Sequence, residues 1–537
     1  MARHDFQLSA PAQSEAVELA AEEGHDTDIP SNLGIIKGPG ADGLDKEFDI
    51  EKCELSSRTS QSGPSDEFNA PAEAANPNVI GWNGDDDPEN PLNWPSSKRW
   101  GTVAIVSSFT FLTPLGSAMF APGVPQIMEE FGSSSELLAG FVVSVYVLGF
   151  AFGPLVVAPL SEMYGRLPLY HACNCLFIVF NVACALSTNL DMLIAFRFFA
   201  GSVGSAPLAL GGGTIADTIS REQRGTAMAL WMSGPTVGPI IGPIAGGFLT
   251  QAAGWRWVFW VTAIAAGVIT VAGIFLMKET YGLAILNHKV ARLKKETGNP
   301  HLKSSLDSGL SPKDLFLFSI IRPSKMLFTS PIVFLLSLYV AVAYAYLYIL
   351  FSTFTSIFVT NYGFTTGTAG LSFLGLGIGS IIGQVLTTVW GNRTAQKHIR
   401  KGDFEPEHRL PLMYPGAVAM PIGLLWYGWS AEFQTHWIVP ILGTGIVGFG
   451  LLMLFMAPNT YLVDVFTLHA ASAMAACTVM RSVFAAVLPL GGQKMYNALG
   501  LGWGNSLLGF IATALIPIPF LFVRYGKRIR TKYPVNL

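Results

Sequence analysis

The chain has 537 residues, of which 50% are hydrophobic and only 13% are charged. Soluble domains carry about 25% charged residues, so this composition indicates a membrane protein. The net charge of −3 hides an asymmetry: residues 1–97 hold 20 acidic and 5 basic residues, and the remainder holds 16 and 28. No nucleophile–base pair, metal-binding cluster or nucleotide motif appears outside the apolar segments, so we expect neither an enzyme nor a metal site, and no nucleic-acid partner.

Residues 1–97 are rich in Ala, Ser, Pro, Asp and Glu and lack apolar periodicity. Such a segment cannot bury enough apolar surface to order itself. We predict a disordered, acidic cytoplasmic tail without a signal peptide, so that the first apolar helix targets the chain to the membrane.

Twelve apolar runs follow, each long enough to cross a bilayer core of about 30 Å. They lie near residues 101–122, 137–160, 169–187, 191–216, 226–249, 257–277, 328–352, 367–390, 411–431, 437–462, 468–490 and 503–523. The fold class expected is therefore an all-α membrane protein with twelve transmembrane helices. The predicted domains are an N-terminal six-helix half (98–277), a cytoplasmic central loop (278–327), a C-terminal six-helix half (328–523) and a basic tail (524–537).

The distribution of basic residues predicts the orientation. With the N-terminus inside, the inner segments hold 24 Lys and Arg residues, whereas the outer loops hold only Arg256 and Lys494. Cytoplasmic loops carry the excess of Lys and Arg, so both termini are expected in the cytoplasm.

The central loop contains an amphipathic pattern, in which Leu286, Val290 and Leu293 share one helix face and lysines the other. We expect a helix lying on the inner membrane surface, with a partner-binding helix as the alternative. A glycine spacing recurs in the second and eighth runs and suggests parallel repeated halves: Gly149, Gly153 and Gly165 against Gly375, Gly379 and Gly391.

The fifth run contains WMSGPTVGPIIGPIAGGFL, with Gly-Pro pairs at four-residue intervals. In a membrane, neighbouring helices can satisfy the backbone groups that proline frees, so the run need not break the helix. Its glycines form a stripe on which another helix can pack closely. The pairs are Gly234-Pro235, Gly238-Pro239 and Gly242-Pro243.

Several stretches are similar to the major facilitator superfamily, and to its fungal twelve-span drug:H+ antiporter branch (DHA1 type), which includes polyamine, multidrug and mycotoxin exporters. They are DDPENPLNWPSSKRW, PLGSAMFAPGVPQIMEEFG, APLSEMYGRLP, the Gly-Pro run with GWRWVFW after it, and NTYLVDVFTLHAASAMAACTVMRSVFAAVLPL. The resemblance covers the chain from residue 85 onward. It implies two pseudo-symmetric halves and export of a hydrophobic or amphipathic compound, such as a fungal metabolite, toxin or drug, by alternating access.

The resemblance also implies roles for individual residues. Glu162, Gly165 and Arg166 match a cytoplasmic charge relay that latches the two halves, and the simpler alternative is a positive-inside turn with a glycine cap. Arg197, inside the fourth apolar run, matches a position associated with proton transfer, and the alternative is an arginine bonded to helix carbonyls. The Gly-Pro run matches the antiporter motif, which implies a kinked, tightly packed helix that favours export, and the alternative is a packing stripe alone.

No carboxylate lies in the middle of an apolar run. Energy from a proton gradient, without a cofactor, is implied by the resemblance alone. Coupling would use an acid at a span end, such as Glu162 or Asp217, together with Arg197, and an uncoupled facilitator stays open.

The apolar runs supply aromatic and polar side chains suited to an amphipathic small molecule. The candidates for the substrate cavity are Tyr344, Tyr348, Gln384, Asn459 and Arg481. A polyamine exporter and a non-transporting sensor of transporter fold are the alternatives. We expect a monomer whose partners are the substrate and the lipid bilayer, in the plasma membrane, with the vacuolar membrane as a second option.

Overall fold

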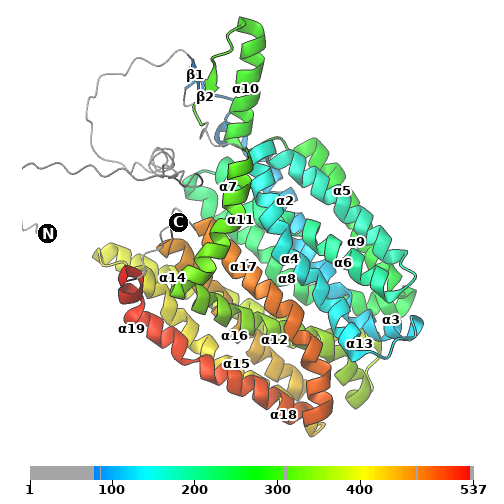
Figure 1. Ribbon diagram of the computed structural model, residues 1–537. Coiled ribbons are helices and arrows are strands. Elements are labelled where there is room, and N and C mark those ends of the chain that lie inside the picture. The colour runs from blue at the N-terminus through cyan, green and yellow to red at the C-terminus, as the bar shows by residue number, and fades with distance from the viewer. Residues whose placement is uncertain (1–77, 85, 307–311, 467–469, 533–537) are drawn as a thin grey trace, which may run out of the picture. The chain divides into compact units, whose positions relative to one another are not determined.

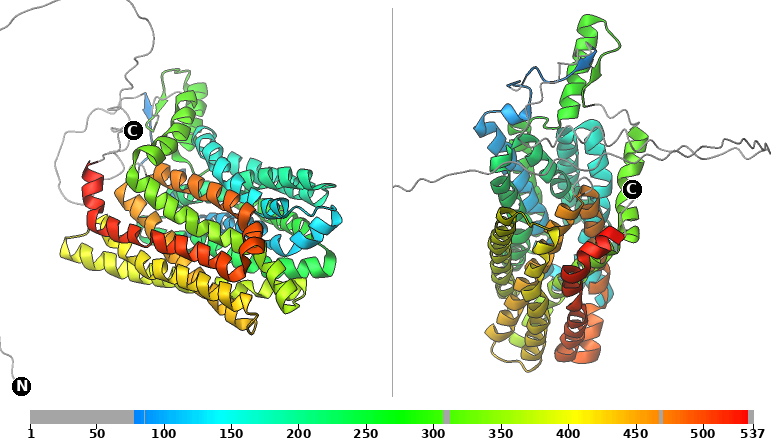
Figure 2. Two further views of the ribbon diagram at one scale, coloured as in Figure 1. Left: turned by 60° about the horizontal axis from the view of Figure 1, so that its bottom comes forward. Right: turned by 90° about the vertical axis from the view of Figure 1, so that its left-hand side faces the viewer.

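The computed structural model describes residues 78–84, 86–306, 312–466 and 470–532. Long helices, which run side by side, account for most of them (Figures 1 and 2). Residues 1–77, most of the predicted tail, lie outside the described residues.

The first half consists of helices α2 to α9, joined by short turns. Their bounds are α2 (Ser96–Met119), η2 (Ala121–Gly123), α3 (Val124–Glu130), α4 (Glu136–Tyr164), α5 (Arg166–Ala185), α6 (Leu190–Gly204), α7 (Ala206–Thr218), α8 (Arg221–Ala253) and α9 (Arg256–Leu276). Helices α6 and α7 together make the fourth predicted span.

The second half repeats this series. Its elements are α11 (Pro312–Thr329), α12 (Pro331–Tyr362), α13 (Thr366–Leu371), α14 (Phe373–Lys401), η3 (Pro406–Leu412), α15 (Met413–Glu432), α16 (Ile438–Val465), α17 (Ala470–Val487), η5 (Leu488–Gly491), α18 (Gly492–Leu515) and α19 (Pro517–Lys532).

Ten helical stretches of the described chain are long and apolar enough to cross a membrane. One of them, Ser472–Lys532, contains both α17 and α18. Helix α8 is not among the ten, because its many glycine and proline residues lower its hydropathy, although it is 33 residues long. Counting α17 and α18 separately and adding α8 gives the twelve predicted helices. The side of the membrane on which the termini lie stays a prediction.

The two halves share one packing pattern. In the first half α2 packs on α8, α4 on α6, and α5 on both α9 and α6; in the second, α12 packs on α17, α14 on α16, and α15 on both α18 and α16. Each pair joins helices at the same positions in the two series of six. This agreement confirms the predicted pseudo-symmetric, all-α fold.

Two seams join the halves. Helix α4 packs against α17, and α8 packs against α13 and α14. One continuous hydrophobic core includes residues of both halves, among them Val143, Phe259, Phe351, Phe354 and Leu451.

A small unit lies outside the two helical series. Strand β1 (Val79–Ile80) pairs in parallel with β2 (Lys303–Ser304), which contacts α10 (Gly282–Thr297). The predicted disordered tail therefore ends too late in the sequence: residues 78–97, apart from 85, are structured, because η1 (Pro91–Asn93) and the turns beside it supply internal hydrogen bonds. The predicted helix of the central loop is α10, but Leu286 and Val290 are buried by the protein itself.

Candidate functional site

The residues of the predicted charge relay meet where α4 gives way to α5. Gly165 has a φ of 93°, in the region that favours glycine, and this lets the chain reverse between the two helices. The guanidinium group of Arg166 donates from Nε to Oδ2 of Asp217 over 2.6 Å. The pair is mostly buried and joins the start of α5 to the end of α7.

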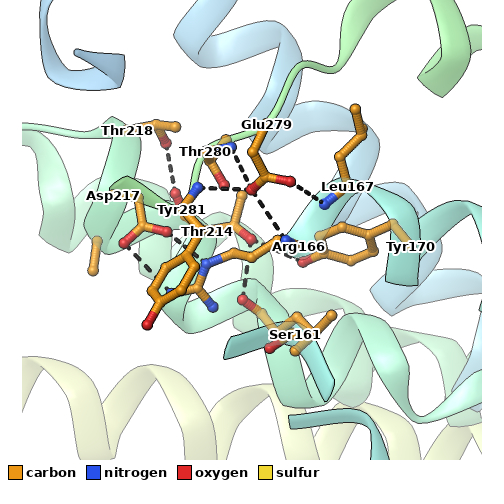
Figure 3. Close-up of polar contacts among 12 residues, drawn as sticks. Ser161, Arg166, Leu167, Tyr170, Thr214, Asp217, Thr218, Glu279, Thr280 and Tyr281 are labelled. Atoms are coloured by element: carbon orange, nitrogen blue, oxygen red, sulfur yellow. Dashed lines mark hydrogen bonds and ion pairs between the residues drawn. The ribbon is translucent and has the colours of Figure 1, made fainter. Parts of the chain in front are cut away.

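Glu279, which sequence analysis did not select, completes this cluster. Its carboxylate accepts hydrogen bonds from the backbone N–H groups of Arg166 and Leu167, each over 3.0 Å, and from those of Thr280 and Tyr281 (Figure 3). A carboxylate at the unpaired N–H groups of a helix start stabilises that helix. Burial raises the pKa of the nearby Tyr281 hydroxyl to about 12, so it stays protonated. The one sequence signal was an acid directly after the sixth apolar run.

Glu162 lies near enough to Arg166 for the two charges to attract each other, but it is not bonded to the cluster. It is exposed at the end of α4, and the described residues give it no hydrogen bond or ion pair. The partners of Arg166 all belong to the first half and the segment directly after it. In this conformation the cluster therefore braces one half and makes no link to the other within the described chain, whereas a latch between halves was expected.

The second half carries a counterpart that sequence analysis also missed. Arg409, in η3 before α15, donates from Nε to Oδ2 of Asp464 over 3.0 Å, at the end of α16. This pair occupies the same place in the second series as Arg166 and Asp217 do in the first. Each half is thus braced by an Arg–Asp pair at the end that carries the basic loops, hereafter the basic end.

Helix α8 holds the Gly-Pro run without a break, because all three prolines lie inside one continuous helix. A Cβ added at Gly238 would lie 2.8 Å from the carbonyl oxygen of Phe111, and one at Gly246 would lie 1.8 Å from that of Met119. The predicted stripe is therefore a contact surface for α2. Gly234 and Gly242 meet the same helix equally closely.

The opposite side of α8 faces the second half. A Cβ at Gly370, in α13, would lie 2.5 Å from the carbonyl oxygen of Pro243. Pro235 and Pro239 are half-buried. Helix α8 thus packs on α2 within its own half and on α13 across the seam, so a change in this helix affects both contacts.

Arg197 is buried in α6, with 1% of its surface exposed. Its Nε donates to the carbonyl oxygen of Val142 over 2.8 Å, and its Nη2 lies 3.4 Å from that of Ser117. Its guanidinium group also stacks on Phe120, 4.1 Å from the ring centroid. These contacts tie α6 to α4 and α2, as in the structural alternative, while Nη1 has no hydrogen-bond partner among the described residues.

Three of the five cavity candidates come together beside Arg197. The Tyr348 hydroxyl lies 3.3 Å from the Ser117 hydroxyl, so it links the second half to the first. The Tyr344 ring contacts Tyr348, with 5.5 Å between centroids, and the Arg481 guanidinium lies 4.8 Å from the Tyr344 centroid. Phe455, missed by sequence analysis, is on the same guanidinium at 4.9 Å. We call Ser117, Tyr344, Tyr348, Phe455 and Arg481 the central cluster.

The other two candidates do not join the central cluster through any contact in the described chain. Gln384 lies on α14 among exposed apolar side chains such as Ile381 and Val385. Asn459 is buried in α16. Each was a candidate for the substrate cavity because it is a polar residue inside an apolar run. The direction in which such a residue faces depends on the rotation of its helix, which the sequence of the run does not give.

The hydrogen bonds between halves concentrate away from the basic end. Besides the Tyr348–Ser117 contact, the Ser144 hydroxyl donates to the carbonyl of Ala486, and the N–H of Gly367 donates to the Gln251 side chain. A fourth joins Asn497 to Glu136 at the start of α4. In the described parts of the chain, the halves are hydrogen-bonded near the end opposite the basic loops.

Two repeated bundles with polar side chains buried at their seam define a membrane transporter, not an enzyme. Residues 106–489 match the family model of the Major Facilitator Superfamily. The chain belongs to this superfamily.

Two fungal transport proteins are similar to the chain over most of their length. The chain is 56% identical over 456 residues to the MFS-type transporter penM of Penicillium rubens, covering 85% of this chain and 90% of that protein. It is 53% identical over 462 residues to the efflux pump radE of Floropilus chiversii, covering 86% of each. Among solved structures, a D-xylose-proton symporter matches with a TM-score of 0.61 and 16% identity, covering 79% of this chain and 97% of that chain.

Proposed function

We propose that the protein exports a hydrophobic or amphipathic small molecule, such as a fungal secondary metabolite, toxin or drug, by alternating access coupled to proton antiport. The observation that carries this proposal is the central cluster, in which aromatic rings of the second half meet the Ser117 hydroxyl of the first half beside Arg197. The efflux activity in the name of a relative that is 53% identical supports the direction of transport.

The central cluster also favours one substrate chemistry. Tyr344, Phe455 and Arg481 are half-buried, so part of each side chain remains exposed. The Nε of Arg481 and the Nη1 of Arg197 have no hydrogen-bond partner in the described structure. Because an unpaired buried donor costs about 1–3 kcal/mol, an acceptor on the substrate would be bound favourably there. We therefore propose an aromatic or amphipathic compound bearing a carboxylate, phenolate or carbonyl group.

The same cluster argues against a polyamine as substrate. The described structure places no carboxylate in an ion pair with Arg197 or Arg481. A polycation moved there from water would lose hydration and meet positive charge, without a counter-charge to offset either cost.

Proton coupling would use acids at the basic end. Glu162 is exposed and unpaired in the described conformation, whereas Asp217 is paired with Arg166. We propose that the two carboxylates exchange partners as the halves rearrange, so that protonation of one acid accompanies each cycle. We place the protein in the plasma membrane as a monomer that needs no cofactor.

An accumulation assay tests the proposal. Yeast cells without their own drug pumps would express the wild type or Arg481→Gln, and uptake of amphipathic acids and of spermidine would be compared with and without an uncoupler. We expect the wild type to lower accumulation of the acids alone, the uncoupler to abolish this effect, and the variant to lose most of it. Equal accumulation with and without the protein for every compound contradicts export, and lowered spermidine alone points to the polyamine alternative.

A further inference from the structure

A polar cavity lies away from the central cluster, between α10 and the segment that precedes α2. It measures about 500 Å³, and five of its ten lining residues are basic. They are Lys98, Lys278, His288, Lys289 and Arg292. Its two acidic residues are Glu89 and Glu279.

Buried contacts assemble one wall of this cavity. Asp87 is 3% exposed and accepts hydrogen bonds from the N–H groups of Asn83 and Glu89. Its Oδ2 lies 3.2 Å from Nζ of Lys289, which is also buried. The hydrogen bonds and Lys289 lower the pKa of the Asp87 carboxyl, so this carboxylate stays charged. This pair fastens the segment before α2 to α10.

The two acidic residues of the cavity already have ion-pair or hydrogen-bond partners. Glu89 lies 3.6 Å from Lys289 and 3.5 Å from Arg292. The carboxylate of Glu279 accepts four backbone N–H groups at the start of α5 and in its own turn. Neither carboxylate is therefore free to neutralise the other basic groups.

Two lysines remain without an acidic partner in the described structure. The ammonium group of Lys98 lies over the ring of Trp94, with Nζ 3.3 Å from the centroid. Lys278 makes no ion pair, and the two ammonium groups lie near enough to repel each other. A cavity of this volume with uncompensated positive charge is suited to an anion with several acceptor oxygens.

The position of the cavity favours a phospholipid as the source of that anion. Lys278 follows the last turn of α9, where Ile274, Phe275 and Leu276 are 57%, 80% and 51% exposed. In a membrane protein, such side chains face acyl chains. A lipid beside α9 would thus place its headgroup at Lys278, and Lys98 stands in the first turn of α2, which packs on α9.

We propose that this cavity binds a phosphate group, supplied by an acidic phospholipid whose acyl chains lie along α9. Each lysine near an anionic headgroup contributes about 1 kcal/mol, so losing both charges weakens binding by roughly thirtyfold. This site is independent of the substrate and of the direction of transport.

Binding by the full-length protein in neutral detergent tests the proposal, with short-chain phosphatidic acid, short-chain phosphatidylcholine and inorganic phosphate as probes. The variants are Lys98→Gln with Lys278→Gln, the charge-retaining Lys98→Arg with Lys278→Arg, and Lys494→Gln as a matched control remote from the cavity. A single monodisperse peak in size-exclusion chromatography shows that each variant is folded.

We expect phosphatidic acid to bind the wild type more tightly than phosphatidylcholine. Binding falls roughly thirtyfold in the double glutamine variant and is retained in the arginine variant and the control. If inorganic phosphate binds as tightly, with the same dependence on the lysines, the phosphate site is supported and the lipid source is refuted. Absence of binding by both phosphate-bearing probes, or binding that the glutamine variant leaves unchanged, overturns the proposal.

Discussion

Substituting alanine for Gly246 tests the close contact between α8 and α2. The added Cβ would lie 1.8 Å from the carbonyl oxygen of Met119. Ordinary contact needs about 3.5 Å, so the backbones must separate by roughly 1.7 Å. Overpacking lowers the free energy of unfolding by about 1–3 kcal/mol, and the better helix propensity of alanine raises it by about 1 kcal/mol. The net effect is a decrease in the free energy of unfolding of up to about 2 kcal/mol.

A matched control separates packing from propensity. Gly267 lies in the middle of α9, and a Cβ there would meet nothing within 4 Å. Gly267→Ala should raise the free energy of unfolding by about 1 kcal/mol through helix propensity, without a steric clash. The two variants should therefore differ in unfolding free energy by about 1–3 kcal/mol.

Thermal unfolding in detergent measures this difference. A thiol-reactive fluorophore reports it, because Cys173, Cys184 and Cys477 are buried and become reactive as the helices separate. We expect Gly246→Ala to melt below the wild type and Gly267→Ala at or above it. Equal melting temperatures for the two variants would refute the contact between α8 and α2.

Four further substitutions test the charged and polar contacts. Asp217→Asn removes the negative charge that pairs with Arg166, and it should lower stability by about 1–3 kcal/mol and slow transport, as thermal unfolding and uptake will show. Asp464→Asn removes the matching charge beside Arg409 and should lower stability equally in the unfolding assay. Tyr348→Phe removes one hydroxyl contact between the halves and should cost about 0.5–1.5 kcal/mol in the same unfolding assay. The Asp87 carboxylate, whose pKa is lowered, stabilises the segment before α2 at pH values above the ordinary pKa of about 4. This stabilisation is lost as the pH falls through the lowered pKa. Hydrogen exchange of residues 78–95 should therefore accelerate on acidification in the wild type, and be fast and pH-insensitive, after correction for intrinsic rates, in Asp87→Asn.

Apolar runs and glycine spacing predicted the helices and the repeat, because both depend on short-range patterns. The membrane requires each backbone to satisfy its own hydrogen bonds, so a run of about 20 apolar residues determines a helix almost alone. The stripe from Gly234 to Gly246 predicted close packing for the same reason, although its partner, α2, could not be read from the run.

Long-range charge contacts were harder to predict. In the sequence, Glu279 and Asp464 are acidic residues near the ends of apolar runs. Only the fold shows that Glu279 caps α5 and that Asp464 pairs with Arg409 as Asp217 pairs with Arg166. The end of the predicted tail was misplaced because Asp87 lies in a very acidic stretch, yet its partner Lys289 is 202 residues away. Composition averages over such a segment and cannot detect one buried pair within it.

Transport in proteoliposomes tests the central claim most directly. Purified protein would be reconstituted with its basic end outward, the interior made acidic, and a fluorescent amphipathic acid added outside. We predict that the compound accumulates inside only while the pH gradient lasts, and that Arg481→Gln abolishes most of this accumulation. Accumulation that is equal without a gradient, or unchanged in the variant, would contradict proton-driven export through the central cluster.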